Sequence, residues 1–128
     1  MNKRFEERDR LIFGEPVDWE RESGGMKSFV AMDADTLQEL VEGGFAQRGD
    51  RQNAAPPLSA FLGFMRACPG KFLAHGYAIS PARPDCRVTV EGLRSVHQAC
   101  FELAVPFVRF CQGADHLELW PQLYAWWD

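Results

Sequence analysis

The sequence lacks the long apolar runs and the excess of basic residues that mark membrane proteins and nucleic-acid-binding proteins. No stretch approaches the ~18 consecutive apolar residues that a membrane-spanning helix needs. The first residues, MNKRFEERDR, are charged and contain no apolar core of a signal peptide. The net charge is −4, whereas binding to phosphates depends on clustered Lys and Arg. These absences predict a cytoplasmic protein with no membrane partner and no nucleic-acid partner.

Paired cysteines are also missing. The sequence has 4 cysteines but no C-x-x-C pair, and a structural zinc site usually needs two such clusters. We therefore expect free thiols. His97 and Cys100, three residues apart, are the one combination that would share a helix face. We interpret them as ordinary helix residues, and no metal or other cofactor is expected.

Familiar catalytic motifs are absent as well. The chain has no G-x-S-x-G elbow, no phosphate-binding G-x-x-x-x-G-K-[ST] loop, no G-x-G-x-x-G and no H-E-x-x-H. Cys86 precedes Arg87, which would lower the pKa of its thiol, but strand alternation turns Cys86 inward. No catalytic residue is predicted, and a non-enzymatic protein is the favoured interpretation.

The length of 128 residues fits one domain. Residues 1–25 are expected to form an N-terminal arm or short helix that ends in a glycine linker. Its apolar side chains, Trp19 among them, would pack on the domain or on another copy. Residues 26–128 are expected to form a single α+β domain.

Apolar spacing and turn residues predict the elements of this domain. The expected order is β-α-α-β-β-α-β-β, which favours a mostly antiparallel sheet with helices packed on one face. Ser95 has capping-box spacing to Gln98, and Pro106 should kink the last helix. The expected strands are 26–32, 71–80, 86–93 and a hairpin within 116–128, and the expected helices are 33–44, 57–70 and 95–113.

Aromatic residues are concentrated near residue 128, in the sequence LYAWWD. A final strand of this kind must be docked, and neighbouring side chains on a strand point to opposite faces. Trp127 would then enter the core, whereas Tyr124 and Trp126 would lie on the other face. With Trp19, these two rings are the predicted interaction surface, because aromatic anchors dominate binding energies. The favoured function is a protein-interaction or regulatory module that binds another protein or a second copy of itself.

The hairpin within residues 72–91 holds the densest set of reactive side chains. His75, Tyr77, Arg87 and Glu91 are the candidate ligand-binding residues. If Ile79 pairs with Cys86, His75 and Tyr77 point into the core. If the pairing slips by one residue, His75 faces Glu91 and Tyr77 faces Thr89, and the sequence alone does not choose between these registers. The alternative function is an anionic-ligand binder or an enzyme, in which Arg87 holds the anion and His75 moves a proton.

Overall fold

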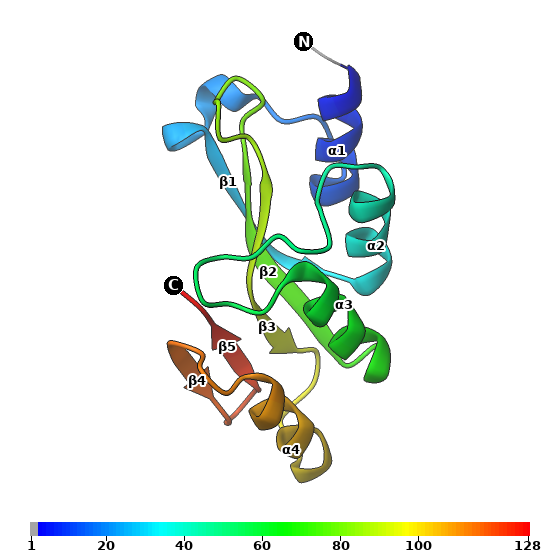
Figure 1. The fold of residues 1–128 in the computed structure, drawn as a ribbon, viewed down its shortest axis with the longest axis vertical. Helices are drawn as coiled ribbons and strands as arrows, with labels where there is room; N and C mark the ends of the chain where they lie inside the picture. Colours follow the sequence, from blue (N-terminus) through cyan, green and yellow to red (C-terminus); the bar gives the residue numbers. More distant parts are fainter. Residues whose placement is uncertain (1–2) are drawn as a thin grey trace.

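The computed structural model describes residues 3–128, which form a single α+β fold with four α-helices and a five-stranded antiparallel sheet (Figure 1). The predicted fold class is therefore confirmed. After the first helix, the helices and strands occur in the predicted order. Two short 3₁₀ turns, η1 and η2, precede the first strand. The bounds are α1 Lys3–Phe13, η1 Trp19–Arg21, η2 Ser23–Gly25, β1 Met26–Met32, α2 Ala34–Glu42, α3 Leu58–Ala67, β2 Phe72–Ile79, β3 Val88–Ser95, α4 Phe101–Phe110, β4 His116–Glu118 and β5 Tyr124–Trp126.

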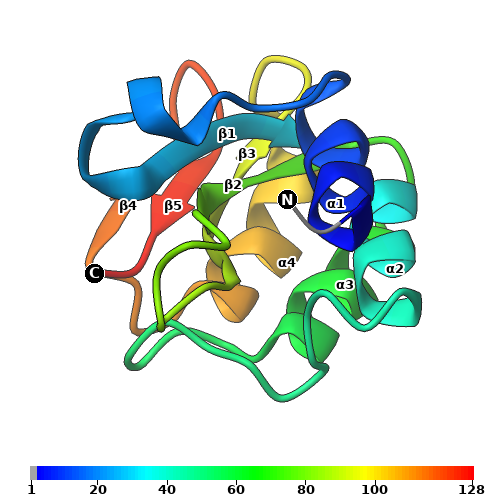
Figure 2. The same cartoon turned by 90° about the horizontal axis from the view of Figure 1, so that it is seen from above.

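The sheet has the strand order β1-β2-β3-β5-β4, and every neighbouring pair is antiparallel. The long β2–β3 hairpin is its centre. Helices α2, α3 and α4 lie on one face of the sheet (Figure 2). Within residues 3–128, no helix is long and apolar enough to cross a membrane.

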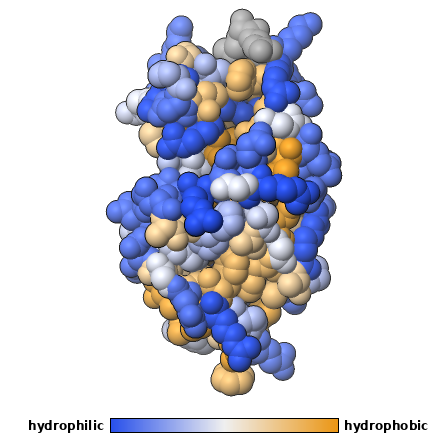
Figure 3. Space-filling view, viewed as in Figure 1, coloured by the Kyte–Doolittle hydropathy of each residue, from blue (hydrophilic) through white to orange (hydrophobic). Residues whose placement is uncertain are grey.

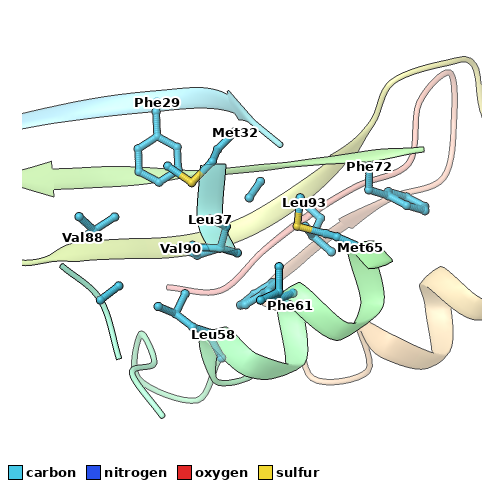
Figure 4. Packing of buried hydrophobic residues seen from close by; sticks show 14 of the residues in the cluster. Phe29, Met32, Leu37, Leu58, Phe61, Met65, Phe72, Val88, Val90 and Leu93 are labelled. Carbon is cyan, nitrogen blue, oxygen red and sulfur yellow. The ribbon is translucent and has the colours of Figure 1, made fainter. Parts of the chain in front are cut away.

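The core lies between this sheet face and the helices (Figure 4). On α3 the buried residues Leu58, Phe61, Leu62 and Met65 follow the predicted i, i+3, i+4, i+7 spacing. They face Val88, Val90 and Leu93 of β3. Trp127 is fully enclosed and meets the Phe61 ring edge-on, with centroids 5.5 Å apart. The aromatic chain end is therefore docked, as its alternation predicts.

Helix α4 begins at Phe101, six residues later than predicted. Ser95, expected to cap this helix, is the last residue of β3. Its Oγ accepts a hydrogen bond from the Leu123 amide at 3.0 Å and donates one to the His97 carbonyl at 2.8 Å. The Ser95 hydroxyl, which has capping-box spacing in the sequence, thus stabilises the end of β3 and does not cap α4. His97 lies in the connection before α4 and Cys100 is its N-cap residue, so the expected shared helix face does not form.

Helix α1 is joined to the sheet through Arg8, which also forms a buried ion pair with its neighbour Asp9. Arg8 and Asp9 are each 1% exposed. Arg8 Nη1 donates to the Ile79 carbonyl at 3.0 Å, and Trp19 Nε1 donates to Asp9 Oδ2 at 2.8 Å. Trp19 therefore packs within its own chain, one of the two arrangements expected for the N-terminal arm. Its ring is only 8% exposed, so its expected role as an exposed interaction anchor is wrong.

Candidate functional site

The register of the β2–β3 hairpin decides which candidate residues meet. Tyr77 lies opposite Thr89, as in the slipped register. A β-bulge between His75 and Gly76 then moves His75 opposite Gly92 and leaves Glu91 as the extra residue of β3. The expected pairing of His75 with Glu91 therefore does not form.

Tyr77 and Arg87, two of the predicted residues, do come together. With Gln52 and Thr89 they form what we term the polar cluster. Arg87 Nη2 donates to the Tyr77 hydroxyl at 3.1 Å, and the hydroxyl donates to Gln52 Oε1 at 3.2 Å. Arg87 Nε donates to Thr89 Oγ1 at 3.1 Å, and Nη1 donates to the Asp85 carbonyl at 3.2 Å. Each of the three guanidinium nitrogens thus donates a hydrogen bond to a neighbouring residue, which fixes the orientation of the Arg87 side chain.

A small hollow of about 180 Å³ lies beside the polar cluster. The chain between α2 and α3 passes in front of β3 there (Figure 1). The hollow mixes acidic, basic and apolar groups, so its charge selects no one class of ligand. Its walls are Asp50, Arg51, Leu58, Arg87, Val88, Thr89 and Val90.

His75 lies over Gly92 and reaches the next strand. Its Nε2 is 3.2 Å from the Ala125 carbonyl, and its ring stacks on Tyr124 with centroids 5.0 Å apart. Because a carbonyl only accepts, Nε2 carries the proton. Burial lowers the pKa of His75, the hydrogen bond to Ala125 raises it, and the Arg94 charge lowers it. His75 is a neutral side chain that joins β2 to β5, rather than a free acid or base.

The histidine stack continues across the sheet face opposite the helices. Trp126 stacks on His116 with centroids 5.8 Å apart, and His116 meets Tyr124 edge-on at 5.9 Å. Tyr124 and Trp126 are half-buried, and they share this face as strand alternation predicts. We call His75, Tyr124, His116 and Trp126 the aromatic row. It supports the β4–β5 hairpin from the open side of the sheet.

Glu91 is held at the bulge, where its carbonyl accepts a hydrogen bond from the Trp127 amide at 2.8 Å. Burial raises the pKa of its carboxyl, and the nearby Asp128 charge raises it further. The charged form of the Glu91 carboxyl is therefore disfavoured, and this carboxyl lies near Asp128. The bulge does not bring that carboxyl to His75 as a base partner.

An exposed apolar surface lies at the end of the molecule formed by α4 and the β4–β5 hairpin. Residues 3–128 contain eight large apolar side chains that are exposed, and six belong to this region. Figure 3 shows apolar colour at the corresponding lower end. We call these six residues the apolar end: Val96, Phe101, Val105, Leu117, Leu119 and Trp120.

Phe101 and Trp120 are the most exposed members, at 83% and 65%. A hydrogen bond of 2.8 Å from the Ala99 amide to the Pro121 carbonyl holds their two segments together. The sequence contains a signal for Phe101, because it falls off the apolar stripe that Leu103, Phe107 and Phe110 define. Trp120 lies at the end of a stretch in which apolar and polar residues alternate, and this alternation does not predict how exposed its side chain is.

Among the described residues 3–128, no group of three or more His, Cys, Asp or Glu side chains could hold a metal ion. The cysteines are free thiols, and burial raises the pKa of Cys111 to about 12, which suits inert packing. No protein-family model, curated protein or solved structure matches this chain.

Proposed function

We propose that this chain is a non-enzymatic protein-interaction module that binds another protein through the apolar end. The observation that carries the proposal is the exposure of Phe101 and Trp120 on neighbouring segments. Apolar side chains scattered singly over a surface need no explanation, whereas a group of them marks an interaction site. Buried aromatic anchors each contribute roughly 2 kcal/mol or more to binding.

The apolar end is presented on a firm base, which favours binding. The Ser95 amide donates to the Leu123 carbonyl at 2.8 Å, and the Leu123 amide donates to Ser95 Oγ at 3.0 Å. The aromatic row holds the same hairpin from the open face. A surface that is already ordered loses little conformational entropy when a partner docks.

The polar cluster supports the alternative, an anion-binding site, less well. Its arginine already donates to Tyr77, Thr89 and Asp85. His75 donates to a backbone carbonyl and lies opposite Gly92, so it has no carboxylate partner to form an acid–base pair.

The test compares proteins captured from lysate of the source organism and identified by mass spectrometry. The bait proteins are the wild type, the double variant Phe101→Ser/Trp120→Ser, and a control, Val30→Ser. Val30 is also apolar and exposed, at 60%, but it lies on β1, away from the apolar end. Far-UV circular dichroism checks that all three proteins fold.

We expect at least one protein that the wild type and the Val30→Ser control retain and the double variant loses. An identical set of captured proteins from all three baits would overturn the proposal. Loss of the same protein from the Val30→Ser control would also contradict it, because binding would then depend on β1.

A further inference from the structure

The two exposed large apolar residues outside the apolar end are Met26, at 39%, and Val30, at 60%. Both lie on β1, which is an edge strand of the sheet. They flank Ser28 symmetrically, two residues away on each side. Because side chains alternate, Met26, Ser28 and Val30 share one face of the strand.

The backbone of the same residues faces away from the sheet. The Ser80 amide donates to the Gly25 carbonyl at 2.8 Å, and Ser28 lies opposite Tyr77. In an antiparallel ladder, alternate residues point their N–H and C=O groups at the neighbouring strand. Gly25, Lys27 and Phe29 therefore bond to β2, whereas the groups of Met26 and Ser28 and the amide of Val30 point outward. A β-bulge shifts the register between Phe29 and Met32, beyond that amide.

Most of these outward groups have no partner among residues 3–128. The Met26 amide donates to the Ser23 carbonyl, which closes η2. The Met26 carbonyl, both backbone groups of Ser28 and the Val30 amide take part in no described hydrogen bond outside the ladder. An edge of this kind is a template for another strand.

We propose that β1 pairs with β1 of a second copy, in antiparallel register centred on Ser28, to form a symmetric dimer with one continuous sheet. Each Ser28 amide then donates to the Ser28 carbonyl of the other copy. Each Val30 amide donates to the Met26 carbonyl, which is the free group of that residue. Met26 lies directly opposite Val30, so the two exposed apolar side chains cover each other.

The charges on β1 also permit this pairing. Lys27 is the only charged residue of the strand. Its side chain is on the other face, where Nζ lies 3.6 Å from Glu22 Oε1 and 4.8 Å from the centre of the Phe13 ring. Across the junction Lys27 meets Phe29 of the second copy, so no like charges oppose each other.

The other edges of the sheet fit a second copy less well. Strand β4 has only three residues, and its ends carry His116 and Glu118. The portion of β3 beyond β5 borders the chain segment of Asp50 and Arg51. By contrast, β1 offers an open edge that is complementary to itself.

Sedimentation equilibrium over a range of protein concentrations tests the dimer. The wild type should show a monomer–dimer equilibrium. Ser28→Pro removes the outward amide without removing a bond to β2, and it should raise the dissociation constant about tenfold or more. Ser28→Ala, which keeps the amide, should leave the dissociation constant unchanged.

A charge pair tests the register itself. Met26→Lys and Val30→Glu should each weaken the dimer, because each buries an uncompensated charge. The double variant Met26→Lys/Val30→Glu places the two introduced charges opposite each other and should recover most of the affinity. This recovery does not depend on whether the Ser28→Pro variant folds.

A wild type that stays monomeric at every concentration would overturn the proposal. A dimer that Ser28→Pro, Met26→Lys and Val30→Glu all leave unchanged would also overturn it, as would a double variant no tighter than the two single charge variants. The Phe101→Ser/Trp120→Ser variant should dimerise normally, because the apolar end lies on a different surface. Failure of the dimer would thus leave the proposed function standing, and the reverse also holds.

Discussion

At the residue scale, the environment of His75 couples the stability of the sheet to pH. Burial, the largest cause, lowers the pKa of this histidine in the folded chain. The unfolded chain, in which a histidine has a pKa of about 6.5, therefore binds more protons in the range just below that value. Stability contributed by neutral His75 is complete above about pH 6.5 and is lost as the pH falls toward the folded pKa.

The variant His75→Phe keeps a ring against Tyr124 and removes the titrating group. We expect the unfolding free energy of the wild type, relative to that of the variant, to fall as the pH falls from about 7.5 to about 5.5. Urea denaturation at both pH values measures this difference, and His97 and His116 cancel because both proteins contain them. A difference independent of pH would show that His75 takes up protons equally in both states.

Residue types alone identify part of the candidate site. The sequence places Tyr77 and Arg87 close together in one of its two registers, and they share a hydrogen bond of 3.1 Å. It cannot place His75, because a bulge leaves no mark in an alternating pattern. It also misplaces Trp19, since the buried acceptor Asp9 sits within a helix that reads as highly charged.

At the element scale, the close approach of β3 to its two neighbours depends on Gly92. A Cβ atom added there would lie 1.9 Å from the Ala125 carbonyl oxygen and 2.6 Å from His75 Cε1. Backbone cannot move aside as a flexible side chain can. We expect Gly92→Ala to lower the free energy of unfolding by about 3 kcal/mol, as overpacking with backbone displacement does.

Gly63 is the matched control. It lies within α3, and a Cβ atom added there has no heavy atom within 4 Å. Gly63→Ala should raise stability by about 0.5–1 kcal/mol, because alanine loses less backbone entropy in a helix. Chemical denaturation of both variants gives the comparison. Equally small changes in the free energy of unfolding of both variants would contradict the close approach of β5 to β3 at Gly92.

The elements themselves follow from local patterns where those patterns are unopposed. The strand 26–32 has the predicted bounds, and the stripe on α3 faces the core. The start of α4 departs from prediction because Ser95 has a partner just before β5, Leu123, far along the chain. Spacing reads only neighbours in sequence, so a tertiary hydrogen bond can override a capping signal.

At the scale of the whole molecule, the large exposed apolar residues within the described range 3–128 divide between two surfaces. Six form the apolar end, and two flank Ser28 on the β1 edge. The two surfaces have different recognition chemistry, since side chains dominate the first and backbone groups the second. The two proposals are therefore compatible, because a dimer formed through β1 would leave the apolar end free to bind a partner.

At the scale of the whole molecule, the contacts of α1 also decide whether this helix unfolds together with the rest of the chain. Arg8 joins α1 to Ile79 of β2, and it is itself paired with its neighbour Asp9, to which its Nε donates a hydrogen bond at 3.0 Å. Removing one partner leaves a buried charge uncompensated. We therefore expect Arg8→Ala or Asp9→Ala to cost about 3–5 kcal/mol each.

The double variant Arg8→Ala/Asp9→Ala should cost less than the sum of the two single variants, because no charge is then left alone. Unfolding is followed by tryptophan fluorescence and by far-UV circular dichroism. Since Trp19 bonds to Asp9 and Arg8 bonds to Ile79 of β2, both signals should move to lower denaturant together. An early loss of helix signal with unchanged fluorescence would instead mean that α1 detaches while the sheet persists. Coincident transitions would show that the hydrogen bond from Arg8 to Ile79 joins the N-terminal helix to one cooperative fold.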